Sequence, residues 1–155
     1  ARLGTLGFRG EVMFMQSNGG LASAELVEAQ PVVLLESGPA GGVSASAQLA
    51  KKIGVGNVLL GDMGGTTFDV SLIRDGKPEI RNSGILHTHA VRSPTIDIDS
   101  VGAGGGSIAW IDAGGGVRIG PESAAADPGP ACYGRGGTRP TVTDCNLLLG
   151  YVDPD

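Results

Sequence analysis

Residues 58–73, VLLGDMGGTTFDVSLI, decide the fold of this 155-residue chain. An apolar run is followed, after four residues, by a segment in which apolar and polar side chains alternate, and this pattern predicts two β-strands joined by a tight turn. The turn consists of Gly64, Gly65, Thr66 and Thr67. Glycine lets backbone N–H groups approach a ligand closely, and successive N–H groups in such a turn form a concave anion site. The stretch therefore predicts a β-hairpin whose turn binds phosphate.

Two aspartates flank this turn. Asp62 ends the first strand, where one carboxylate is enough to help hold a hydrated Mg²⁺, because this ion keeps several of its waters. Asp69 follows the turn on the second strand. The alternative interpretation is an ordinary Gly-rich hairpin with a structural aspartate, since a motif match is a hypothesis about function.

Length and composition limit the class of protein. The chain is long enough for one domain with a real core, and its formal net charge is −5. No basic patch stands out and aromatic residues are scarce, which argues against a nucleic-acid partner. No apolar run approaches ~18 residues, so no membrane span is expected. Cys132 and Cys145 lack the Cys-x-x-Cys spacing, which favours free thiols in a reducing cytosol and a cytoplasmic location.

Local signals predict the helices. Ser23 is expected to cap a short helix at 23–29, and a proline-started helix over 40–52 is expected to bury Val43, Ala47 and Ala50 and to end at Gly54. A last short helix is predicted at 144–149, with Thr143 as its cap and Gly150 at its end.

Strands are predicted around these helices, at 12–16, 32–35, 78–81, 107–111 and 117–119. The 32–35 segment is expected to be buried. Because Asp75-Gly76 is a strong two-residue turn signal, the 58–81 region is expected to form a three-strand meander. The sequence therefore predicts an α/β fold, a mixed sheet with hairpins and flanking helices, as a single partial domain over 1–155.

Glycine accounts for 28 residues, and four of them fall among the five positions 102–106. Such a segment is expected where the backbone is crowded against a ligand or another strand, and it also suits a hinge. Trp110 follows in the next strand and is expected in the core rather than at a cofactor.

Other polar residues allow two interpretations each. The 121–140 segment is the longest irregular stretch. Glu122 and Asp127 there could act in acid–base chemistry, bind a metal or simply face solvent. Arg135 could bind a phosphate or a carboxylate. The pairs His87/His89 and Asp97/Asp99 have the spacing of strand residues that share a face. Two solvent-facing polar edges are favoured there over a metal site.

Residues 62–71, DMGGTTFDVS, resemble the second phosphate loop of the actin, sugar-kinase and heat-shock-chaperone ATPases. The resemblance becomes more specific when five further motifs are considered, at 37–42, 101–108, 120–124, 127–134 and 141–144. Together and in this order they resemble the hydantoinase A / 5-oxoprolinase family, which includes the ATP-using subunits of acetone and acetophenone carboxylases.

The resemblance implies an actin-like (ribonuclease H-like) ATPase domain that uses ATP and Mg²⁺ to hydrolyse a cyclic amide, of the hydantoin or 5-oxoproline type, through a phosphorylated substrate oxygen. Phosphoryl transfer asks the protein for positioning and charge stabilisation. Asp62 would organise Mg²⁺ and Asp69 would polarise a threonine or water. The phosphates would be bound by Gly64, Gly65, Thr66 and Thr67, with Gly104 and Gly105 as further nucleotide contacts.

ATPases of this fold close two half-domains around the nucleotide, whereas this chain has one such loop. We therefore expect a central fragment, weak in nucleotide binding and inactive alone, whose partners are the remainder of its subunit and a hydantoinase B-type subunit. The alternatives are a ketone carboxylase subunit, an ATPase of the same fold with a chaperone or filament role, and a non-catalytic nucleotide-binding module.

Overall fold

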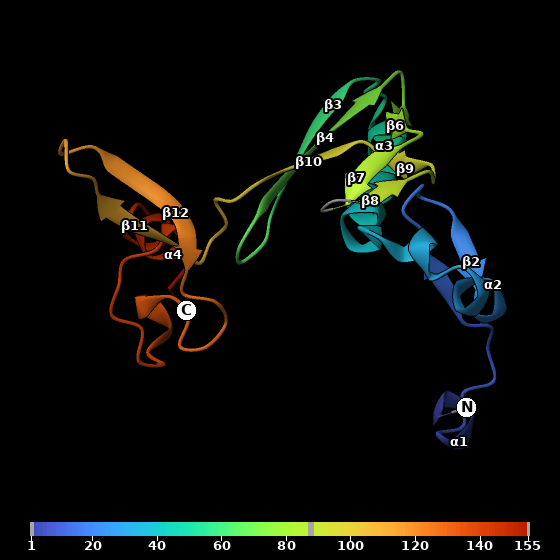
Figure 1. Cartoon of the computed structure of the whole chain (residues 1–155), viewed down its shortest axis with the longest axis horizontal. Helices are drawn as coiled ribbons and strands as arrows, with labels where there is room; N and C mark the ends of the chain where they lie inside the picture. Colours follow the sequence, from blue (N-terminus) through green and yellow to red (C-terminus); the bar gives the residue numbers. More distant parts are fainter. Residues whose placement is uncertain (1, 87–88, 155) are drawn as a thin grey trace. The chain divides into compact units, whose positions relative to one another are not determined.

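The structure is a computed structural model that describes residues 2–86 and 89–154. Its contacts divide the chain into two compact units, Ala1–Val58 with Leu72–Asp97, and Leu59–Ser71 with Ile98–Asp155. The elements are labelled along the chain in Figure 1. None of the helices within the described ranges is long and apolar enough to cross a membrane.

The first unit is built around one long helix. It contains α1 (Arg2–Thr5), β1 (Met13–Met15), β2 (Leu21–Ser23), α2 (Ala24–Ala29), the 3₁₀ helix η1 (Pro31–Leu34) and α3 (Ser37–Ile53). Three small antiparallel ladders accompany them: β1–β2, β6 (Ile80–Arg81) with β9 (Thr95–Ile96), and β7 (Gly84–Leu86) with β8 (His89–Val91).

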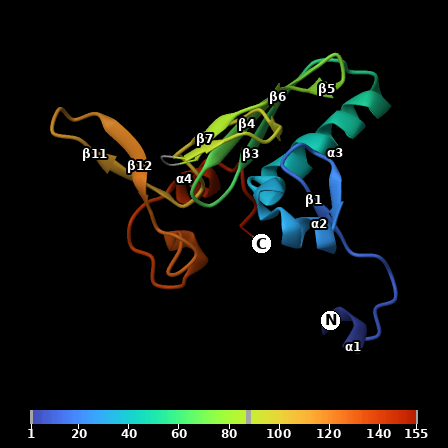
Figure 2. The same cartoon turned by 45° about the vertical axis from the view of Figure 1, so that its right-hand side comes forward.

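Helix α3, seen along its length in Figure 2, supplies much of this unit's core. Its face with Ala40, Val43, Ala47 and Ala50 is buried. Small side chains three and four residues apart form one stripe, which lets neighbouring strands approach the helix closely. The helix ends at Gly54, whose φ of 75° is the left-handed conformation of a glycine C-cap. The predicted helix, its buried face and its end are confirmed, as is the cap of α2 by Ser23.

One predicted strand of this unit is wrong. Residues 31–34 form the 3₁₀ helix η1 with Pro31 at its start, and Val32 is exposed. Proline fixes φ near the helical value, and four apolar residues are too few for periodicity to separate a strand from a helical turn. The turn is anchored by Ser17, whose N–H and hydroxyl both donate to the carbonyl of Val33 at 2.7 Å.

The organising hairpin consists of β3 (Val58–Met63) and β4 (Phe68–Arg74), and the sheet order is β10–β4–β3 with β5 (Lys77–Pro78) also on β4. The predicted meander is therefore confirmed, and Asp75 and Gly76 both adopt positive φ in its turn. The predicted strand at 78–81 is divided: β5 pairs with β4, whereas β6 pairs with β9.

The second unit contains this hairpin's turn, β10 (Ile98–Val101), the antiparallel pair β11 (Ser107–Ile111) and β12 (Val117–Ser123), the 3₁₀ helix η2 (Ala131–Tyr133) and α4 (Val142–Leu148). Strand β10 pairs antiparallel with β4, Val101 opposite Phe68 and Ile98 opposite Ser71. The mixed α/β class with hairpins and helices is confirmed.

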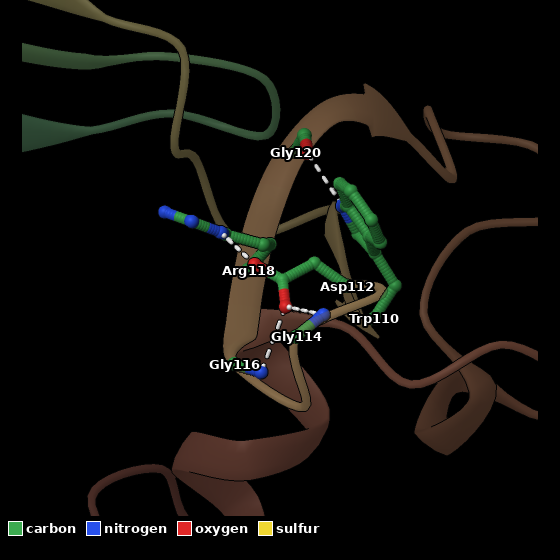
Figure 3. Close-up of polar contacts among 6 residues, drawn as sticks. All are labelled: Trp110, Asp112, Gly114, Gly116, Arg118 and Gly120. Atoms are coloured by element: carbon green, nitrogen blue, oxygen red, sulfur yellow. Dashed lines mark hydrogen bonds and ion pairs between the residues drawn. The ribbon is translucent and has the colours of Figure 1, made fainter.

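Figure 3 shows how the β11–β12 hairpin is closed. The Asp112 carboxylate accepts N–H bonds from Gly114 at 3.0 Å and Gly116 at 2.8 Å, and it pairs with Arg118 at 2.7 Å. The hydrogen bond with Arg118, more than those with the backbone, lowers the pKa of Asp112. Trp110 is 43% exposed, so its expected place in the core is wrong. Its indole N–H reaches across the hairpin to the carbonyl of Gly120 at 2.8 Å.

The candidate metal site of His87/His89 with Asp97/Asp99 falls partly outside the described residues. His87 and the side chain of His89 lie outside the described residues, and Asp97 forms an ion pair with Arg81. Within the described ranges, no three residues among His, Cys, Asp and Glu gather as a metal site. Glu122 pairs with Arg139 at 2.5 Å.

Candidate functional site

The candidate site begins at the turn between β3 and β4. The N–H of Gly64 donates to the carbonyl of Thr67 at 2.9 Å and closes the turn. Asp62 occupies the next-to-last position of β3 and is exposed. Asp69 lies on β4 opposite Ser100 of β10.

A second segment, residues 102–106, runs along this turn and binds its carbonyl groups. The N–H of Gly104 donates to Thr66 at 3.2 Å, that of Gly105 to Gly64 at 2.9 Å, and that of Gly106 to Gly65 at 2.6 Å. A Cβ atom on Gly104 would lie 2.6 Å from backbone atoms of Thr66. The crowding expected over 102–106 is therefore confirmed at Gly104 and Gly106, where the neighbour is the turn itself, whereas a Cβ on Gly102 would meet nothing within 4 Å.

This arrangement turns the hairpin tip into a surface of hydrogen-bond donors. Among the described residues, no hydrogen bond is donated by the backbone N–H of Gly65, Thr66 or Thr67, whereas the carbonyls of Gly64, Gly65 and Thr66 are all used. Backbone N–H groups of a turn that have no protein partner are the kind of donor that binds an anion. A phosphate is the ligand that such a tip suits best.

A further layer holds the 102–106 segment in place. Both the N–H and the hydroxyl of Thr143, on α4, donate to the carbonyl of Gly105, at 2.8 and 2.9 Å. The N–H of Ala124 donates to the carbonyl of Gly106 at 2.8 Å. The expectation that Thr143 caps α4 is therefore wrong. Thr141 is the N-cap, in a capping box with Asp144, and Thr143 is left to bind the glycine segment.

Asp144 joins α4 to the preceding loop. Its carboxylate accepts N–H bonds from Cys132 at 2.7 Å, Thr141 at 2.8 Å and Ala131 at 3.3 Å, and the Thr141 hydroxyl donates at 2.9 Å. Burial alone would raise the pKa of Asp144, but the hydrogen bonds from Cys132 and Thr141 outweigh it and lower the pKa to about 2. A separate hydrogen bond between the Cys132 thiol and the Asp144 carboxylate raises the pKa of that thiol. This part of the 121–140 segment is therefore ordered by one carboxylate.

These layers enclose a cavity of about 590 Å³, a volume typical of small-molecule sites. The hairpin turn, the glycine segment, the 124–133 loop and α4 all contribute to its wall. The lining residues are Met63, Gly64, Gly65, Thr66, Gly105, Gly106, Ala125, Ala126, Pro130, Tyr133, Thr143, Asn146 and Val152.

The cavity brings together some of the predicted site residues and not others. Gly64, Gly65, Thr66 and Gly105 line it, and Gly104 lies directly behind Thr66. Asp62, Thr67 and Asp69 are not among its lining residues. The sequence interpretation missed the wall made by the 124–133 loop and by α4, because hydrogen bonds that join distant segments create it. The one available signal was the pair of threonines at the start of α4, Thr141 and Thr143.

The charged groups in and around the cavity indicate whether a Mg²⁺ could bind there. No lysine or arginine lines it, so the backbone N–H groups are its only fixed donors of positive potential within the described residues. One oxygen of Asp69 is buried without a hydrogen-bond partner, which marks it as ready to accept a proton donor or a cation. The exposed carboxylate of Asp62 is a ligand type that suits a Mg²⁺ which keeps its waters and binds chiefly to phosphate oxygens. The residues present therefore fit this ion.

The chain is similar to several known proteins. The alpha subunit of caprolactamase from Pseudomonas jessenii is 43% identical over 147 residues, which are 95% of this chain and 21% of that subunit. A chain of the crystal structure of the ATP-dependent caprolactamase from this organism matches with a TM-score of 0.75 and 40% identity, over 98% of this chain and 23% of its own length.

Two further relatives widen the comparison. The nucleotide-free structure of acetone carboxylase, from work on ATP-dependent acetone carboxylation, matches with a TM-score of 0.78 and 34% identity, over 99% of this chain and 22% of that chain. The 5-oxoprolinase 1 of Arabidopsis thaliana is 43% identical over 145 residues, 93% of this chain and 11% of that enzyme.

The chain thus spans between a tenth and a quarter of the length of the curated relatives it matches. A family model described as hydantoinase/oxoprolinase matches residues 1–155. The chain belongs to the hydantoinase/oxoprolinase family.

Proposed function

We propose that this chain is the phosphate-binding part of a larger ATP-using subunit that hydrolyses a cyclic amide. One observation carries the proposal: among the described residues, the backbone N–H groups of Gly65, Thr66 and Thr67 donate no hydrogen bond, while three carbonyls of the same turn are bound by the 102–106 segment. The similarity to caprolactamase and 5-oxoprolinase supports a cyclic amide as the substrate.

In this proposal the chain's residues position the phosphates of ATP. The N–H groups of Gly65, Thr66 and Thr67 and the hydroxyl of Thr66 bind phosphate oxygens, and Gly104 and Gly105 hold the turn in that shape. Asp62 would help to hold a Mg²⁺, which when bound would supply positive charge to the phosphates. Asp69 accepts a hydrogen bond from a water or a threonine hydroxyl and so orients it.

The chemistry explains why ATP is needed. An amide carbonyl is a poor electrophile, and phosphorylation of its oxygen makes the carbon reactive. The bond between the γ-phosphorus and its bridging oxygen breaks, ADP leaves, a new O–P bond forms, and the amide N–H is lost as a proton. Water then adds to the carbon, the C–N bond breaks with a proton returned to nitrogen, and a second water releases phosphate from the acyl phosphate. The products are the open amino acid, ADP and phosphate.

A second candidate function is a ketone carboxylase subunit. The observation that favours it is the TM-score of 0.78 with acetone carboxylase. Here the phosphoryl group goes to the oxygen of a ketone or of bicarbonate, and the same turn binds the nucleotide. The two candidates differ in whether turnover requires bicarbonate.

The test uses the complete subunit with its partner subunit, which we propose to be of the hydantoinase B type in the cytoplasm. ADP release is measured with 5-oxoproline, hydantoin or caprolactam, in the presence and absence of bicarbonate. The proposal predicts that ADP release requires a cyclic amide and Mg²⁺ and that its rate does not depend on bicarbonate. ADP release that requires a ketone and bicarbonate would establish the second candidate. If neither an amide nor a ketone stimulates ADP release, both assignments are wrong.

A further inference from the structure

Helix α4 carries a polar side chain into the cavity that the phosphate-binding role leaves unused. Thr143 and Asn146 are three residues apart, so they lie on one face of the helix, and both line the cavity. Thr143 binds the carbonyl of Gly105, whereas none of the hydrogen bonds among the described residues involves the side-chain amide of Asn146. Asn146 is half-buried and therefore presents an unused donor and an unused acceptor to the cavity.

The surroundings of Asn146 differ from the phosphate-binding wall. Other parts of the lining are supplied by Ala125, Ala126, Pro130 and Tyr133. The Tyr133 ring is supported by the Arg135 guanidinium, 5.8 Å from the ring centroid. Small apolar side chains and one aromatic ring suit the hydrocarbon part of a small ring compound. This leaves one side-chain amide beside an apolar wall, next to the phosphate site.

The amide group of a cyclic amide is complementary to the side-chain amide of Asn146. Its ring forces the peptide-like bond to be cis, so its N–H and C=O lie side by side on one edge. The carboxamide of asparagine has the complementary pair, with Oδ1 as acceptor and Nδ2–H as donor. Two parallel hydrogen bonds can therefore form at once. The substrate's carbonyl oxygen has two lone pairs, so it retains one for the phosphoryl group after accepting from Nδ2.

We infer that Asn146 is the residue that recognises the amide edge of the substrate, and that the wall of Ala125, Ala126, Pro130 and Tyr133 holds its ring. This inference rests on the proposed function, because it places the amide in the same cavity as the phosphates. A ketone lacks the N–H, so it forms only one of the two hydrogen bonds. A site of this kind thus discriminates by leaving its own polar atom unpaired when the substrate's N–H is missing.

The test measures binding rather than turnover, because N-methylation would also change the chemistry. The complete subunit with its partner is loaded with Mg²⁺ and an ATP analogue that cannot transfer its γ-phosphate. The dissociation constants of an unsubstituted lactam and of its N-methyl derivative are then compared for wild type and Asn146→Leu, which has a similar shape and no polar atoms. Two neutral hydrogen bonds correspond to about a 10- to 30-fold change in affinity.

The inference predicts that wild type prefers the unsubstituted lactam by about tenfold. Asn146→Leu should bind this lactam about 10- to 30-fold more weakly and should no longer distinguish it from the N-methyl derivative. The control is Cys145→Leu, at the neighbouring exposed position of the same helix, which should retain wild-type preference. Asn146→Asp is a second variant of the same shape. The aspartate should still accept a hydrogen bond from the N–H of the lactam. Its second carboxylate oxygen should repel the lactam's carbonyl oxygen, so this variant should bind the lactam more weakly than wild type.

The outcomes separate the inference from the proposed function. If wild type hydrolyses a cyclic amide with ATP but Asn146→Leu keeps the preference for the unsubstituted lactam, the inference alone is wrong. The same holds if wild type binds both lactams equally. If Asn146→Leu fails to bind the ATP analogue, the comparison passes to Asn146→Asp, where unchanged lactam affinity overturns the inference. If wild type shows no amide-dependent ADP release, the proposed function falls and the inference falls with it.

Discussion

Replacing Asp144 with asparagine (Asp144→Asn) should loosen the attachment of the η2 turn to α4. Three backbone N–H groups and one hydroxyl point at the Asp144 carboxylate. Asparagine has the same shape, but it carries no charge, and one of its two polar atoms is itself a donor. Some of those donors therefore lose their partner, and an NH₂ group faces N–H groups in at least one place.

The magnitude follows from the pKa. The pKa of Asp144 is about 2 in the folded protein, against about 3.9 in an unfolded chain. The folded-state pKa is the lower one, so the stabilisation by the carboxylate is complete above about pH 4 and is lost as the pH falls toward 2. A difference of this size corresponds to about 2.5 kcal/mol, which solvent screening of a partly exposed group reduces to about 1.5 kcal/mol. We therefore expect local opening to become roughly tenfold more frequent at pH 7.

Amide hydrogen exchange of the complete protein measures this opening locally. Peptides that cover 131–133 and 141–145 should exchange about tenfold faster in Asp144→Asn than in wild type at pH 7, and this ratio should shrink as the pH falls from 4 toward 2. The matched control is Asp112→Asn, which removes another turn carboxylate and should affect only the β11–β12 hairpin. Equal exchange of the 131–133 peptide in Asp144→Asn and wild type at pH 7 would refute the reasoning.

Three further predictions concern single groups of the site. The Cys132 thiol, whose pKa is raised by its hydrogen bond with Asp144, should be alkylated faster in Asp144→Asn, with its pH profile moved to lower pH; an unchanged profile would contradict this coupling. Asp62→Asn should raise the Mg²⁺ concentration that half-saturates ADP release by about tenfold, and an unchanged Mg²⁺ dependence would exclude Asp62 as the metal-binding residue. Thr143→Val removes the hydroxyl bond to Gly105 but keeps the backbone bond, so the KM for ATP should rise about fivefold, with the helical circular dichroism signal unchanged; an unchanged KM would mean that this hydroxyl does not help to hold the glycine segment.

Much of the fold was predictable because its signals are local. The alternation after Phe68, the glycines of the turn and the positive φ required at Asp75-Gly76 all act within a few residues, and the structure has the meander that they predict. The α3 helix was equally predictable, since the residues of its buried stripe and its glycine C-cap belong to one continuous segment.

The errors have local causes as well. Four apolar residues after Pro31 suit a strand and a 3₁₀ turn equally, and proline at the first position decided between them. Two threonines lie near the start of α4, Thr141 just before it and Thr143 within its first turn. Asp144, three positions after Thr141, completes a capping box that makes Thr141 the cap.

The cavity could not be predicted in the same way. Its wall is made where the 102–106 segment, the 124–133 loop and α4 meet the hairpin turn, through hydrogen bonds between residues as far apart as Gly105 and Thr143. The sequence predicts crowding over the whole 102–106 segment, but only the structure shows which of its glycines are crowded and identifies their neighbour as the turn. For this reason Asn146 and Tyr133 had no signal of their own.

The central claim is that the hairpin tip, held in shape by the glycine segment, binds the phosphates of ATP. The most direct test is the dissociation constant of Mg²⁺–ATP for the complete protein, as wild type, Gly104→Ala and Gly102→Ala. A Cβ on Gly104 would lie 2.6 Å from the backbone of Thr66 and Thr67 and must displace the turn, whereas one on Gly102 would meet nothing within 4 Å. Displacement of a binding group by about 1 Å can cost about 100-fold.

The account predicts about 100-fold weaker binding of Mg²⁺–ATP by Gly104→Ala and wild-type binding by Gly102→Ala. Wild-type affinity in Gly104→Ala, or an equal loss in both variants, would contradict it.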